Sequence, residues 1–133
     1  MIKPFTFICP RDWDCFELLV NSAEALSDPS LGPWTAYYDP AEPPDDRMRS
    51  FASKHHVDFR ERLSGFSPWS ERSGEVKLDG FYQTACRSDD DDLVVHVDSD
   101  CIFYSNEILR QVDTVDFAGF EHSERRTVDC LKR

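Results

Sequence analysis

The sequence predicts an α/β protein with a mostly parallel sheet and helices on both faces. Segments rich in strand formers alternate with segments whose apolar residues recur at helical spacing, and parallel strands need such helical crossovers between them. An apolar run at residues 93–97 ends abruptly at Asp98 and Asp100, which is typical of a buried strand with a ligand site at its carboxyl end. With 133 residues, 40% of them hydrophobic, we expect one domain over residues 1–133.

The first strand is expected at residues 5–9, which end at Pro10, a residue without the N–H that a central strand donates. Asp14 and Glu17 have capping-box spacing and predict the start of a helix. This helix should end at Asp28, because a proline follows it. Its apolar residues, which recur at helical intervals, are Phe16, Leu19, Val20, Ala23 and Leu26.

A second strand is expected at residues 34–38, followed by a proline-rich loop. Asp45 and Asp46 suit the positive end of the next helix, and residues 54–56 suit its negative end. A weaker third strand is expected within residues 57–63, where charged residues interrupt the pattern. Strand and helix therefore alternate a second time.

The second half of the chain continues this alternation. Residues 65–74 contain proline and two glycines without periodicity and predict a loop. After the strand at residues 93–97 we expect a turn, a short helix over residues 106–112 and a strand over residues 116–120. The helix before that central strand has an expected apolar face of Leu78, Phe81, Tyr82, Ala85 and Cys86.

The composition of the chain limits the classes of partner that we expect. Its 26 acidic and 15 basic residues give a formal net charge of −11, which repels phosphate backbones, so no nucleic-acid partner is expected. The same acidity also serves solubility. The five cysteines include no C-x-x-C pair and favour a reducing, cytoplasmic location. We expect neither a signal peptide nor a membrane span.

Asp98 and Asp100 are the strongest candidates for a functional site. Two carboxylates at a strand end can hold Mn²⁺ or Mg²⁺, which keeps its other positions for water and phosphate oxygens. The alternative is a solvated turn with helix-capping aspartates, because the same spacing recurs at Asp12 and Asp14 and within residues 89–92. The apolar strand before Asp98 favours the metal interpretation of this pair over the others.

Two further residues fit either a site or an ordinary structural role. His96 precedes Asp98 by two residues, so strand alternation places it on the same face of the sheet as Asp98 and Asp100. A role at the site and a buried histidine satisfied by the backbone both fit that position. Arg11 follows a strand and precedes a helix, which suits a phosphate contact or a surface arginine among acidic neighbours.

Three segments together resemble the first half of a GT-A glycosyltransferase, and in particular the nucleotide-diphospho-sugar transferase-like proteins. They are residues 8–14 leading into a helix, residues 80–86 as a later helix, and residues 92–100 with the Asp-Ser-Asp element. The resemblance covers about residues 5–120 and implies a Rossmann-like fold of GT-A type. Members of that family continue into further elements that hold the acceptor, so the chain looks truncated relative to them.

The resemblance implies a metal-dependent glycosyltransferase that moves a sugar from a nucleotide-diphospho-sugar to an acceptor hydroxyl. Carried over by position, Asp98 and Asp100 become the ligands of Mn²⁺ or Mg²⁺. The positions that the resemblance places at the nucleotide sugar are Pro10, Arg11, Asp12, Gln83 and Asp98.

Three alternatives stay open beside the transferase. One is a non-catalytic nucleotide- or partner-binding half-domain that a second chain or a second copy completes. Another is an acidic interaction protein whose aspartates only interact with water. The third is a metal-dependent phosphohydrolase. The interaction protein should be indifferent to divalent metal and nucleotides, whereas a phosphohydrolase should release phosphate without any acceptor.

Overall fold

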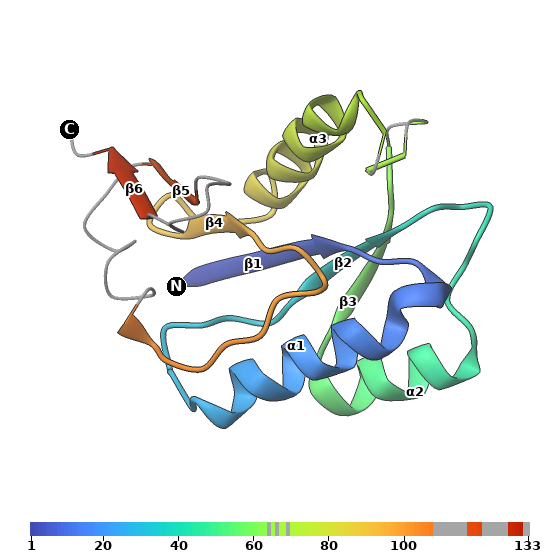
Figure 1. Ribbon diagram of the computed structural model, residues 1–133, viewed down its shortest axis with the longest axis horizontal. Helices are drawn as coiled ribbons and strands as arrows, with labels where there is room; N and C mark the ends of the chain where they lie inside the picture. The colour runs from blue at the N-terminus through green and yellow to red at the C-terminus, as the bar shows by residue number, and fades with distance from the viewer. Residues whose placement is uncertain (64, 66, 69, 108–116, 121–127, 132–133) are drawn as a thin grey trace. The chain divides into compact units, whose positions relative to one another are not determined.

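The computed structural model of the chain describes residues 1–63, 65, 67–68, 70–107, 117–120 and 128–131 (Figure 1). The chain divides into two units, Met1–Phe103 and Tyr104–Arg133. All the site residues expected from the sequence lie in the first unit.

The first unit is built on a four-stranded sheet in the order β3-β2-β1-β4. Every neighbouring pair of strands is parallel, with register pairs Phe5↔Thr35, Phe5↔His96 and Ala36↔Phe59. The expected parallel sheet and the alternation of strands and helices are therefore confirmed. The strands are β1 (Ile2–Phe7), β2 (Thr35–Tyr38), β3 (Asp58–Glu61) and β4 (Leu93–His96), and the helices are α1 (Trp13–Ala25), α2 (Asp46–His55) and α3 (Ser73–Ala85).

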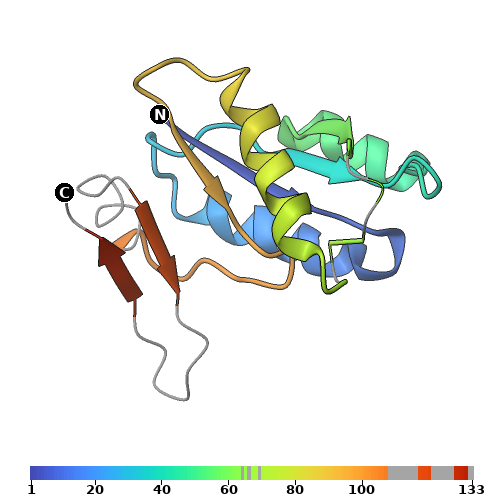
Figure 2. The same ribbon diagram turned by 90° about the horizontal axis from the view of Figure 1, so that it is seen from above.

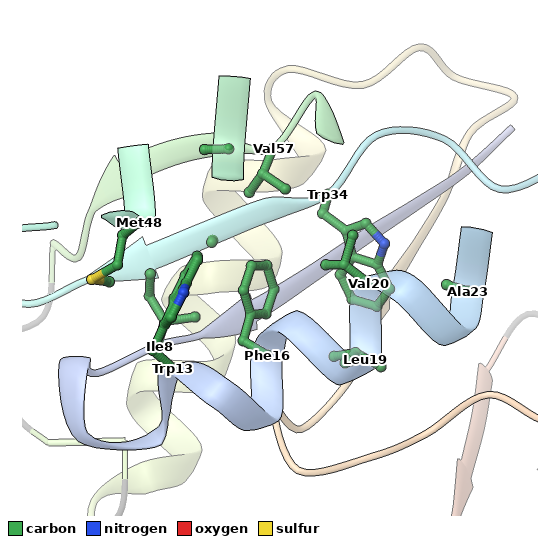
Figure 3. Close-up of a cluster of buried hydrophobic side chains, with 11 residues drawn as sticks. Ile8, Trp13, Phe16, Leu19, Val20, Ala23, Trp34, Met48 and Val57 are labelled. Carbon is green, nitrogen blue, oxygen red and sulfur yellow. The ribbon is translucent and has the colours of Figure 1, made fainter. Parts of the chain in front are cut away.

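Helices α1 and α2 cover one face of this sheet, and α3 covers the other (Figure 1). On the first face, the α1 residues Trp13, Phe16 and Leu19 project toward the strands (Figure 3). They pack with Trp34 and Met48 in one buried cluster. Burying such side chains is the main favourable contribution to folding, and here it fixes α1 beside the end of β1.

The second face depends on a glycine of α3 as well as on its apolar residues Val76 and Phe81. The expected apolar face of this helix is right only at Phe81, which packs against the buried cluster that contains Phe5. Leu78 and Tyr82 are 69% and 70% exposed, and Ala85 and Cys86 are exposed as well. The residues that α3 buries are Val76, Gly80 and Thr84. A Cβ atom at Gly80 would lie 2.6 Å from Cε2 of Phe5, so only glycine lets the helix approach the sheet this closely.

Several boundaries differ from those expected; β1 ends at Phe7 and α1 at Ala25, both earlier than expected. Helix α1 begins at Trp13 with Asp12 as its N-cap, and neither Asp12 nor the expected capping box supplies a side-chain cap. Asp14 instead binds Arg47 at 2.8 Å. Helix α3 begins at Ser73, inside the expected loop. Strand β1 begins at Ile2 and includes Pro4, which is tolerated because the β1–β2 register starts only at Phe5.

The second unit contains an antiparallel pair, β5 (Phe117–Phe120) and β6 (Val128–Leu131). The strand expected at residues 116–120 is confirmed, whereas β6 was not expected. Nearly all of the helix expected at residues 106–112 lies outside the described residues.

Candidate functional site

The order of the strands creates a switch point between β1 and β4. From β1 the chain builds the sheet outward through β2 and β3, and β4 then returns to the other side of β1. Open parallel sheets bind ligands at the carboxyl ends of the two strands that flank such a point. The segments that follow β1 and β4 contain five of the six site residues expected from the sequence.

Asp98 and Asp100 follow β4 in a turn that opens to solvent. The Val97 N–H donates to the Phe5 carbonyl at 3.0 Å, which keeps the chain beside β1 past the end of β4. The Cys101 N–H then donates to the Asp98 carbonyl at 3.1 Å and closes the turn. Both aspartates are exposed, so folding does not desolvate their carboxylates. The carboxylates are accessible to a ligand from solvent.

Pro10, Arg11 and Asp12 form a 3₁₀ turn between β1 and α1, and all three are exposed. The Cys9 thiol donates to the Asp12 carboxylate at 3.3 Å. Burial raises the pKa of the Cys9 thiol, which keeps it protonated for this bond. Because Asp12 forms no side-chain cap, the positive end of the 13-residue helix α1 faces this loop without a capping carboxylate.

Lys77 and His96 lie close to the Asp98 carboxylate, and Lys77 was not expected from the sequence. Lys77 of α3 brings its Nζ to 3.9 Å from Oδ1 of Asp98. His96 brings its Nε2 to 3.7 Å from the same oxygen. The shared face that strand alternation predicts for His96 and Asp98 is therefore confirmed.

His96 is a largely buried histidine that is neutral at ordinary pH. Its ring lies among aromatic rings, with centroids 5.1 Å from Phe5 and 5.6 Å from Phe7. Burial, opposed by the charge of Asp98 and aided by that of Lys77, lowers the pKa of His96 to about 4. The side chain is 12% exposed and its Nε2 lies beyond hydrogen-bond distance of Asp98, so its main contacts are with the aromatic rings of the sheet.

Gln83 stands apart from the other expected site residues. It is half-buried on α3, which runs alongside β4 in the opposite direction (Figure 2). Six residues of helix separate Gln83 from Lys77, or about 9 Å along the axis, in the direction of the amino end of β4. The structure thus brings Lys77, rather than Gln83, to the Asp98 turn.

The donor set fits a cation that is shared with a phosphate ligand. No group of three or more His, Cys, Asp or Glu side chains within the described residues could hold a metal ion. Mg²⁺ is usually bound through one or two carboxylates, with waters and substrate phosphates at the remaining positions. Asp98 and Asp100 match that pattern, because both carboxylates are exposed on one turn.

A hollow of about 490 Å³ lies elsewhere, where the helices α1 and α2 end. Its lining includes Glu24, Trp34, His55 and His56, and the His55 Nδ1 atom lies 2.9 Å from a Glu24 carboxylate oxygen. None of the expected site residues lines this hollow, so the switch point, identified by the order of the strands and not by a cavity, remains the candidate site.

Among the residues that the structure describes, no helix has the length and apolar character needed to cross a membrane. A scan against protein-family models, a search of curated proteins and a search of solved structures each found no match.

Proposed function

We propose that this chain binds the diphosphate group of a nucleotide sugar together with a divalent cation, Mn²⁺ or Mg²⁺. The observation that carries the proposal is the position of Asp98 and Asp100, exposed on one turn at the switch point between β1 and β4. A parallel sheet presents its ligand site there, and two carboxylates are a common protein contribution to a magnesium site shared with phosphates.

The opposite side of the switch point offers groups suited to an anion. Arg11 is exposed on the loop after β1, and α1 begins immediately after that loop. The amino end of a helix attracts phosphate through its unpaired N–H groups and its dipole. We assign Asp98 and Asp100 to the cation, and Pro10, Arg11 and Asp12 to the nucleotide.

Transfer of the sugar to an acceptor hydroxyl is the reaction that the GT-A resemblance implies. The bound cation would supply charge stabilisation to the departing diphosphate. In this proposal the chain's own residues bind and orient the donor: the two aspartates from the end of β4, and the loop at residues 10–12 from the end of β1.

A thermal melt tests the binding step. The wild-type chain, Asp98→Ala and Asp100→Ala are melted with Mn²⁺, with UDP or GDP, and with metal and nucleotide together. A ligand at about 100 times its dissociation constant stabilises the native state by about 2.7 kcal/mol, and a melt detects such a change. We expect stabilisation in wild type that requires both components and is lost in both variants.

Asp91→Ala is the matched control, because Asp91 is an exposed aspartate that precedes β4 and has the same spacing to Asp89 as Asp100 has to Asp98. It should keep the full stabilisation. No shift in wild type under any condition would overturn the proposal and favour the acidic interaction protein. Release of UDP or GDP from a sugar nucleotide, measured with and without sugar acceptors, then separates transfer from binding alone.

A further inference from the structure

Lys77 brings a positive charge to the candidate site, and its weak contact with Asp98 is the only ion pair that it makes among the described residues. The Lys77 and Asp98 side chains are 40% and 57% exposed and 3.9 Å apart. Exposed ion pairs of this kind contribute little to stability. The pair therefore contributes little to folding. What it does is place a positive charge beside Asp98 at the switch point.

The position of Lys77 is set by a rigid part of the fold. The preceding residue, Val76, is fully buried in the cluster that also contains Phe5, Phe7 and Tyr37. One turn later, Gly80 holds α3 against the rings of Phe5 and Phe7. The backbone of Lys77 is thus fixed beside the carboxyl end of β4, while its long flexible side chain can carry the ammonium to a new partner.

The Lys77 ammonium would compete with a divalent cation for the Asp98 carboxylate. A cation on Oδ1 of Asp98 would share that oxygen with Lys77 Nζ, and two positive charges at such a distance repel each other. A bound diphosphate removes the conflict, because its oxygens accept from the ammonium while the metal keeps the carboxylate.

We propose that Lys77 is a phosphate-binding residue of this site, whose ammonium pairs with Asp98 in the free protein and with the diphosphate in the bound protein. This inference rests on the proposed function. It assigns Lys77 two opposite effects, since the ammonium hinders the metal when no nucleotide is present and assists the nucleotide when the metal is bound.

The test measures the two effects separately in Lys77→Met, by titration calorimetry with Mn²⁺ alone and then with UDP or GDP at saturating Mn²⁺. Without the ammonium, Mn²⁺ alone should bind about two- to fivefold more tightly, as the loss of one exposed charge interaction predicts. The nucleotide should bind about tenfold more weakly, because a charge-assisted hydrogen bond is lost.

Two variants control for charge and for folding. Lys77→Arg keeps a cationic donor and should bind the nucleotide within about threefold of wild type, in contrast to the methionine variant. Lys54→Met removes an exposed lysine from α2 and should change neither affinity. A thermal melt of each variant without ligands verifies that α3 remains folded.

The outcomes distinguish the two proposals. If wild type binds the nucleotide with Mn²⁺ and Asp98→Ala does not, the proposed function stands. Unchanged nucleotide affinity in Lys77→Met, or weaker Mn²⁺ binding, would then overturn the role of Lys77 alone. If wild type binds neither UDP nor GDP, both proposals fail together.

Discussion

Replacing Gly80 by alanine tests whether the close approach of α3 to the sheet holds this face together. The added Cβ would lie 2.6 Å from Cε2 of Phe5 and 3.0 Å from Cζ of Phe7. Neither ring has room to move, because Phe5 is fully buried and packs edge-on against Phe7, Tyr37 and Phe81. The helix or a ring must therefore shift.

The size of the effect follows from two opposing terms. Overpacking a buried site costs about 1–3 kcal/mol, while alanine gains up to about 1 kcal/mol over glycine in a helix interior. Gly74 lies on the same helix, and a Cβ atom added there would meet nothing within 4 Å. Gly74 is the second residue of α3, so Gly74→Ala keeps part of the favourable term without the clash.

Urea unfolding followed by tryptophan fluorescence measures both variants. Gly80→Ala should be about 1–3 kcal/mol less stable than Gly74→Ala, which isolates the steric term. A displaced α3 should also carry Lys77 away from Asp98 and weaken any nucleotide binding. Equal stability of the two variants would refute the argument that Gly80 sets the distance between helix and sheet.

Two further predictions concern His96 and the start of α2. Burial lowers the pKa of His96 from 6.5 to about 4, so between these pH values the unfolded chain binds more protons and stability falls as the pH decreases. In metal-free buffer, wild type should lose up to about 3 kcal/mol more unfolding free energy than His96→Phe between pH 7 and pH 4; parallel pH profiles would contradict this. The Asp45 carboxylate accepts from the Met48 N–H at 2.9 Å, so Asp45→Ala should lower the free energy of unfolding by about 1 kcal/mol in urea and Asp45→Asn by much less. Equal losses in the two variants would argue against a capping role.

Strong local patterns predicted most of the sheet. The apolar run before Asp98 and the aromatic-rich residues 34–38 indicated strands β4 and β2, and Asp45 is the N-cap of α2 as its type and position suggested. The carboxylates of the candidate site could be predicted because they belong to the same short segment as β4.

The helical spacing of apolar residues did not predict most of the buried face of α3. An amphipathic interpretation of α3 selects Leu78 and Tyr82, yet both are exposed. The buried positions carry Val76, Gly80 and Thr84, and the Thr84 hydroxyl lies 2.9 Å from that of Tyr37. Hydrophobicity does not mark a glycine that is needed for close approach, so most of the predicted face of the helix was wrong and Lys77 went unnoticed.

The position of Lys77 matters for the proposed diphosphate site, because the chain as a whole is acidic. With a net charge of −11, the protein repels anions at long range, and the exposed Asp98 and Asp100 add to this locally. Lys77 lies against Asp98 only because α3 crosses the sheet at Gly80, while Arg11 follows β1. The acidic half of the proposed site is therefore local in sequence, whereas the basic half is assembled from two separate elements. A pattern search along the chain finds the two aspartates and Arg11, and only the packing of α3 on the sheet brings Lys77 to them.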